Sequence, residues 1–192
     1  MENTFENKYI GWYNWSMALA ALIVSIIALV LALHTIAQRV WGKPDLIIGF
    51  DTRESKGGKV MTCKLHNYPI AWGIKKKLGV RTMPIEDLVT SFEIAEYGSN
   101  KVKYPGKVPK IQKYDGVSNA QRINLPASIF PAYFGVASVH YDTKTVTVFE
   151  EDDTDLSIGK YVVKVHAQFQ ENERKAERIL VVHGEYPYAY WE

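Results

Sequence analysis

The sequence predicts a mainly β protein, built as a β-sandwich, behind a single N-terminal transmembrane helix. The helix is predicted by Ser16–Ala37, which contains no Asp, Glu, Lys or Arg. About 20 apolar residues at 1.5 Å rise each span the roughly 30 Å of a bilayer's hydrocarbon core. The sandwich is predicted by about eight short segments of alternating polarity, separated by turns rich in Gly and Pro.

The 192 residues divide into four parts. Residues 1–15 form a short N-terminal tail, and residues 16–41 form the transmembrane helix and its interfacial flank. Residues 45–185 form the β-sandwich, and residues 186–192 form an aromatic C-terminal tail. A domain of about 148 residues after the helix is long enough to bury one sizeable core.

The flanks of the apolar stretch favour a retained anchor over its two alternatives. Trp12 and Trp15 precede it and Trp41 follows it, as in the aromatic belts of membrane interfaces, with Arg39 beside Trp41. A cleavable signal peptide has a basic start and a shorter apolar run, although Thr35–Ala37 offers small residues for cleavage. A core helix of a globular protein is the third alternative.

Small residues recur along the predicted helix at steps of three or four. Such a stripe lets two helix backbones approach closely in lipid, so it predicts a helix-packing face toward a second copy or a partner membrane protein. Because Ala is common in such helices, chance spacing is the alternative. The stripe consists of Ala18, Ala21, Ser25, Ala28, Ala32 and Thr35.

Basic residues near the two helix ends predict the orientation. The N-terminal side has Lys8 alone, whereas Arg39, Lys43, Arg53, Lys56 and Lys59 follow the helix. Cytoplasmic flanks are enriched in Lys and Arg, so we expect a single-pass protein of the cell membrane with a cytoplasmic domain. An extracytoplasmic domain is the alternative.

Charge is unevenly divided along the domain. Residues 39–122 contain 16 Lys and Arg against 8 Asp and Glu, and residues 123–192 contain 6 against 11. The basic half could bind an anionic membrane leaflet. The alternative is that the imbalance only reflects unequal charges on solvated loops. The acidic half and the lack of a nucleic-acid motif argue against a nucleic-acid partner.

The predicted elements follow Gly42–Pro44, which ends the helix. Leu88–Glu96 fits either a helix or a strand, and the strand is favoured because Leu88, Phe92 and Ile94 share one side. A helical turn opened by Pro84, an exposed loop at Pro105–Gly116 and an apolar loop around Ile129 are also expected. The remaining strands are expected at Asp45–Arg53, Lys59–His66, Lys101–Tyr104, Ala120–Leu125, Gly135–Tyr141, Thr145–Glu150, Gly159–Gln170 and Lys175–His183.

Asp155–Val165, followed by a hairpin, resembles the penultimate strand of immunoglobulin-like domains. Tyr161 occupies the place where such domains often put a corner tyrosine whose hydroxyl bonds back to the backbone. The resemblance covers about 30 residues and implies an immunoglobulin-like β-sandwich. The single cysteine, Cys63, departs from the paired cysteines of antibody domains, and no Trp follows it within the next strand.

Candidate chemistry is sparse. The acidic run that includes Asp152, Asp153 and Asp155 is a weak calcium candidate, and a solvated strand connection is its alternative. Cys63 alternates with apolar neighbours, which predicts a buried thiol. The histidines lack ligand spacing, so we expect no metal site, no cofactor and no enzyme activity.

The C-terminal tail is rich in aromatic residues with polar tips. Tyr186, Tyr188, Tyr190 and Trp191 could dock a protein or a membrane surface, or could pack on their own domain. The expected function is a non-catalytic interaction or assembly module whose partners are the lipid bilayer and a second copy or another membrane protein. A membrane-tethered ligand-binding or sensor domain is the alternative, and an anchored enzyme is the least favoured.

Overall fold

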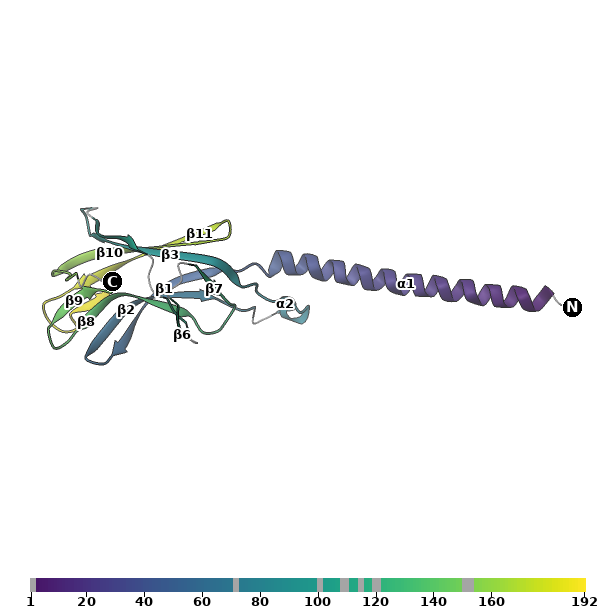
Figure 1. Ribbon diagram of the computed structural model, residues 1–192, viewed down its shortest axis with the longest axis horizontal. Coiled ribbons are helices and arrows are strands. Elements are labelled where there is room, and N and C mark those ends of the chain that lie inside the picture. Colours follow the sequence, from purple (N-terminus) through teal and green to yellow (C-terminus); the bar gives the residue numbers. More distant parts are fainter. Residues whose placement is uncertain are drawn as a thin grey trace. The chain divides into compact units, whose positions relative to one another are not determined.

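The computed structural model describes residues 3–70, 73–99, 102–107, 111–113, 116–118, 122–149 and 154–192. The chain forms two compact units. One contains Met1–Lys43 and Ile70–Arg81, and the other contains Pro44–Pro69 and Thr82–Glu192. Figure 1 shows the long helix of the first unit and the strands of the second.

Helix α1 (Asn3–Trp41) contains the whole of the predicted anchor. The helix begins well before Ser16, whose hydroxyl donates to the carbonyl oxygen of Tyr13 at 2.8 Å, so the boundary predicted at Ser16 is not a helix end. The most apolar stretch of the segment Trp12–Trp41 has a mean hydropathy of 2.8, and none of that stretch is buried in the described chain. It is long and apolar enough to cross a membrane.

Helix α2 (Ile74–Lys77) is one short turn in the first unit. It ends at Gly79, which adopts a φ of 70° that glycine tolerates. The amide of Gly79 donates to the Lys76 carbonyl and the amide of Val80 to the Lys75 carbonyl, each at 3.0 Å, which is the Schellman helix end. The helical turn expected after Pro84 is therefore wrong, because residues after Pro84 enter a strand and the turn lies ten residues earlier.

The second unit is mainly β and contains two sheets. The first has the order β1-β2-β8-β5-β6, and β9 also pairs with β8. The second has the order β12-β11-β10-β3-β4, and β7 also pairs with β3. The strands of the first sheet are β1 (Leu46–Ser55), β2 (Gly58–Asn67), β5 (Ile111–Lys113), β6 (Gly116–Ser118), β8 (Ala132–His140) and β9 (Thr145–Val148). Those of the second are β3 (Ile85–Glu96), β4 (Val102–Lys107), β7 (Ile123–Leu125), β10 (Gly159–Phe169), β11 (Asn172–Val182) and β12 (Ala189–Trp191).

Most of the predicted strands are confirmed, with shifted ends. Leu88–Glu96 is a strand, and its inward side buries Leu88, Phe92 and Ile94. The last hairpin turns at Gln170 and Glu171, because Phe169 pairs with Asn172, so the turn expected at residues 171–174 was too long. The loop expected at residues 105–116 is wrong in part, since β4 extends to residue 107 and β5 lies at residues 111–113. Residues 120 and 121 of the strand expected at Ala120–Leu125 lie outside the described residues, and β7 forms the end of that strand.

One hydrophobic core lies between the two sheets. Phe92 of β3 stacks on Phe134 of β8 with ring centroids 5.9 Å apart. Cys63 is fully buried in this core, which confirms the predicted buried thiol, and burial raises its pKa. The largest fully buried side chains are Phe92, Phe134, Met61, Leu65, Ile85, Leu88, Ile94, Leu180, Val136, Val139 and Val148.

Tyr161 makes the backbone contact that the sequence predicted for it. The side chain is 2% exposed, and its hydroxyl donates to the Ser157 carbonyl oxygen at 2.8 Å. The Ser157 hydroxyl lies 2.9 Å from the same phenol oxygen. This pair fixes the chain at its entry to β10, because both polar groups are satisfied beside the core.

Candidate functional site

The predicted packing stripe lies along the apolar segment of α1. At about 100° per residue, its six positions fall on one side of the helix, within roughly 100° of arc. All six residues (Ala18, Ala21, Ser25, Ala28, Ala32 and Thr35) are exposed within the described chain. The Ser25 hydroxyl donates to the Ala21 carbonyl at 2.8 Å and the Thr35 hydroxyl to the Leu31 carbonyl at 2.9 Å, so both hydroxyls are satisfied within the helix.

The predicted interfacial residues lie at the two ends of this segment. Trp12 and Trp15 are 71% and 65% exposed at one end, and Trp41 is 39% exposed at the other. Arg39 lies in the last helical turn and is exposed. Indole rings at both ends of an apolar span suit the two headgroup regions of a bilayer.

The segment Gly73–Arg81, here called the basic arm, is hydrogen-bonded to the C-terminal end of α1. The side-chain amide of Gln38 donates to the Arg81 carbonyl oxygen and accepts from the Arg81 amide at 2.9 Å. At Gly42 the fit is tight, because an added Cβ would lie 2.7 Å from the Arg81 carbonyl oxygen. This contact brings Lys75–Lys77 to the end of α1, which no sequence pattern indicated.

The basic arm changes which residues count as the basic flank of the helix. Arg53, Lys56 and Lys59 lie at the opposite end of β1 and β2 from Leu46, where the strands begin. Arg53 lies seven residues along β1 from Leu46, which at about 3.3 Å per residue is about 23 Å. These three residues belong to the second unit and the helix end to the first, so their part in the flank stays a prediction.

Six basic residues surround the C-terminal end of α1 instead. We call them the basic collar, and all six are exposed. Residues 34–44 and 70–81 contain no Asp or Glu, and within the described residues no ion pair joins the collar to a carboxylate. The collar consists of Arg39, Lys43, Lys75, Lys76, Lys77 and Arg81.

An exposed apolar loop lies at the end of the sandwich where β1 begins. Ile129 is 69% exposed and Phe130 is 48% exposed. The amide of Ser128 donates to the carbonyl oxygen of Asn67 at 3.0 Å, and Asn67 pairs with Leu46, the first residue of β1. The apolar loop therefore lies near the point where the chain enters the sandwich.

The aromatic tail forms the edge strand β12, which pairs with β11. The indole N–H of Trp191 donates to the Asp51 carbonyl oxygen at 2.8 Å, and its ring lies 4.9 Å from that of Phe50. Because Asp51 and Phe50 belong to β1, Trp191 joins the two sheets. Tyr186, at 74%, is the most exposed of the predicted docking residues, Tyr190 is 39% exposed and Tyr188 is half-buried.

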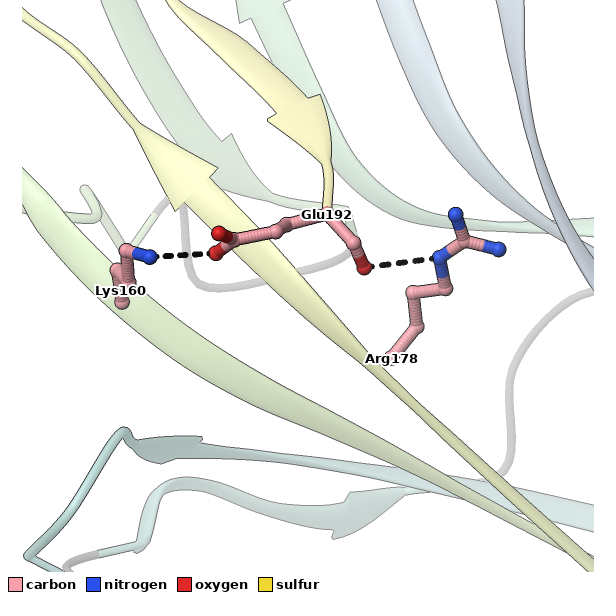
Figure 2. A network of polar contacts seen from close by, with 3 residues as sticks. All are labelled: Lys160, Arg178 and Glu192. Carbon is pink, nitrogen blue, oxygen red and sulfur yellow. Dashed lines mark hydrogen bonds and ion pairs between the residues drawn. The ribbon is translucent and has the colours of Figure 1, made fainter.

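The last residue of the chain is held by two basic side chains (Figure 2). Lys160 forms an ion pair with the Glu192 carboxylate, and this hydrogen bond is the main cause of the raised pKa of Lys160. Arg178 donates from Nε to the Glu192 main-chain oxygen at 3.0 Å. These contacts tie the end of β12 to β10 and β11.

The outer face of β3, β10 and β11 carries an open groove of about 550 Å³. Lys164 forms an ion pair with Glu93 at 3.5 Å, and His166 and Lys175 both contact the Glu173 carboxylate. The hydrogen bond from Lys175 is the first cause of the lowered pKa of Glu173. Alternating charges on neighbouring strands stabilise an exposed face, and each such pair contributes little.

The predicted calcium residues are not brought together within the described part of the chain. Asp152 and Asp153 lie outside the described residues, and Asp155 is exposed and forms an isolated bridge with Thr147. Among the described residues, no group of three His, Cys, Asp or Glu side chains could hold a metal ion. The calcium site stays a prediction.

No protein-family model matches the chain, and a comparison with curated proteins finds no match. The apolar helix, the basic collar and the two sheets are therefore the features that bear on function.

Proposed function

We propose that the protein is a single-pass membrane protein whose β-sandwich is a non-catalytic interaction or assembly module. The observation that carries the proposal is the uncovered apolar segment Trp12–Trp41. Exposing so many apolar side chains to water is costly, so the segment requires lipid or partner helices around it. The tryptophans at the two ends of the segment favour lipid over partner helices as its main surroundings.

The small-residue stripe supports helix association as the mode of assembly. Its steps alternate between three and four residues, which is the 3.5-residue period of left-handed helix packing. Small side chains at these positions would let two α1 helices, or α1 and a partner helix, approach closely. The hydroxyls of Ser25 and Thr35 bond to their own helix, so packing rather than hydrogen bonding would drive the contact.

The sandwich follows the helix closely and is proposed to lie near the bilayer. Leu46, the first residue of β1, is only five positions after Trp41. Four intervening residues can extend at most about 14 Å.

The orientation we propose places the sandwich on the cytoplasmic side. The basic collar puts six Lys and Arg residues at the C-terminal end of α1. The N-terminal 15 residues contain Lys8 alone. Excess Lys and Arg beside a span is retained in the cytoplasm.

The immunoglobulin-like character of the sandwich is part of the same proposal. Two sheets around one core and the hydrogen bond from Tyr161 to Ser157 support it. An immunoglobulin-like scaffold suits recognition of a partner. Cys63 is buried and its raised pKa keeps it a thiol, which supports a non-catalytic role.

A tethered ligand-binding or sensor domain is the second candidate. The groove on β3, β10 and β11 favours it, because polar side chains from three strands converge there. Its ion-paired lining suits a polar ligand. Lys164→Ala would break the ion pair with Glu93 in the groove and should weaken binding of such a ligand while leaving helix association unchanged.

Association of α1 in a membrane reporter tests the proposed assembly. Ala28→Leu and Ser25→Leu should each lower self-association or partner association several-fold, because a branched side chain separates the backbones. Ala20→Leu is the matched control, since Ala20 lies about 110° from the centre of the stripe. Equal signals from all three variants would refute assembly through the stripe.

A further inference from the structure

The basic arm is held at one level along α1. The two hydrogen bonds between Gln38 and Arg81 fix its end to the last helical turns. An added Cβ at Gly79 would lie 3.7 Å from Cε1 of His34, so the arm also reaches the turn before. The arm therefore lies beside residues 34–42 of the chain, at the end of the apolar segment.

The fold of the basic arm presents its lysines outward. Lys75, Lys76 and Lys77 form the single turn of α2 and are all exposed. Val80, which follows the Schellman glycine, is only 3% exposed and anchors the turn. Leu78 is 51% exposed among the lysines, so the arm combines cationic and apolar groups on its open side.

We infer that the basic collar binds anionic phospholipid headgroups of the bilayer that α1 crosses. The inference rests on the proposed membrane span, because it places the collar at the headgroup region. The headgroup phosphate supplies the negative charge that the collar lacks, and the acyl chain lies along the apolar surface of α1. Basic clusters next to a span attract anionic lipid, each residue contributing about fivefold in affinity.

The ligand belongs to the bilayer and is not a free phosphate. The collar is exposed and does not enclose an anion, so soluble phosphate would lose little water on binding. A lipid headgroup is concentrated at the membrane surface and is held there by its acyl chains. Gln38 acts as a positioning residue, because it sets the level of the arm without contacting the headgroup itself.

Lipid retention by the full-length protein tests this inference. The protein in neutral detergent is mixed with equal amounts of phosphatidylglycerol and phosphatidylcholine, and native mass spectrometry counts the lipids retained. The wild type should favour phosphatidylglycerol. The variant Lys75→Gln/Lys76→Gln/Lys77→Gln should lower the preference for phosphatidylglycerol at least tenfold. The variant Gln38→Leu keeps every charge of the collar but releases the arm from α1, so it should lower the preference as well.

Two control variants separate charge at the collar from total charge. Arg53→Gln/Lys56→Gln/Lys144→Gln removes three positive charges from the turns at the far end of the first sheet and should keep the preference. Replacing Lys75, Lys76 and Lys77 by Arg should also keep it. An equal loss in the far-end control, or a loss in the arginine variant, would overturn the inference.

Two further measurements separate the possible failures. Displacement of phosphatidylglycerol by 20 mM inorganic phosphate at constant ionic strength would show a free-phosphate site and overturn the lipid assignment. Carbonate extraction of the same proteins from membranes tests the span itself. Extraction of the wild type refutes the span, whereas retention with an unchanged lipid preference in the lysine variant refutes the collar alone.

Discussion

Replacing Trp191 tests whether the aromatic tail is part of the folded domain. Trp191→Phe keeps an aromatic ring against Phe50 but removes the indole N–H that bonds to Asp51 at 2.8 Å. Loss of one partly buried hydrogen bond costs about 1 kcal/mol. Trp191→Ala also removes the ring contact, worth about 1 kcal/mol, and about 100 Å² of apolar burial at roughly 25 cal/mol per Å².

The expected losses are therefore about 1 kcal/mol for Trp191→Phe and about 4.5 kcal/mol for Trp191→Ala. For a chain of this size, each kcal/mol lowers Tm by about 2–4 °C. Differential scanning calorimetry of the full-length protein in detergent should show Tm falling by about 2–4 °C for Trp191→Phe and by about 9–18 °C for Trp191→Ala. Calorimetry is preferred to fluorescence because the variants remove a tryptophan.

Tyr186→Ala is the matched tail control, since Tyr186 is 74% exposed. It should change Tm by no more than about 2 °C. If Trp191→Ala were no more destabilising than Tyr186→Ala, β12 would not join the two sheets in solution. If the Trp191→Ala protein stayed as stable as the wild type but no longer bound a partner protein, the hypothesis that the tail is a docking surface would be supported instead.

Three further outcomes follow from single sites. Gly58→Ala should lower Tm sharply or prevent folding, since its Cβ would lie 1.9 Å from the backbone oxygen of Val139, and calorimetry checks this. Cys63 should resist maleimide at pH 8 until denaturant is added, and rapid labelling of the native protein would contradict its burial. Burial lowers the pKa of Lys59 despite the opposing effect of Glu54, so the unfolded chain binds this proton more tightly. The free energy of unfolding should therefore rise with pH between the lowered pKa of Lys59 and its ordinary pKa. Urea titration at pH 7 and pH 10 checks this. Lys59→Met should abolish the rise, and its free energy of unfolding at pH 7 should be no lower than that of the wild type.

The fold was predictable where a single pattern governs a segment. Ser16–Ala37 lies within α1 because an uncharged apolar run of that length favours a helix. The strands β2, β8 and β10 follow alternation of polarity in the sequence, which indicates burial on one side. The backbone contact of Tyr161 was implied by the resemblance of Asp155–Val165 to a strand of immunoglobulin-like domains.

The basic collar was not predictable, because it depends on contacts between distant segments. Gln38 and Arg81 are 43 positions apart, and neither belongs to a recognisable motif. Their hydrogen bonds bring the lysines of the basic arm to the helix end. A sequence signal did exist in the run of three lysines closed by Gly79, which fits a capped helical turn, but it did not indicate where the turn packs.

The role of Trp191 was left open for a similar reason. Alternating tyrosines are typical of both an exposed docking surface and an edge strand. The pairing with β11 and the hydrogen bond to Asp51 depend on how the two sheets pack against each other. The residues around Trp191 alone do not predict that packing.

The most direct test of the account is protease accessibility in sealed vesicles from cells that express the full chain. We predict that the protein resists carbonate extraction and that residues 44–192 are digested only when the cytoplasmic face is open to protease. Release of the intact protein by carbonate, or digestion of the sandwich from the opposite face, would contradict a single span with its basic collar in the cytoplasm.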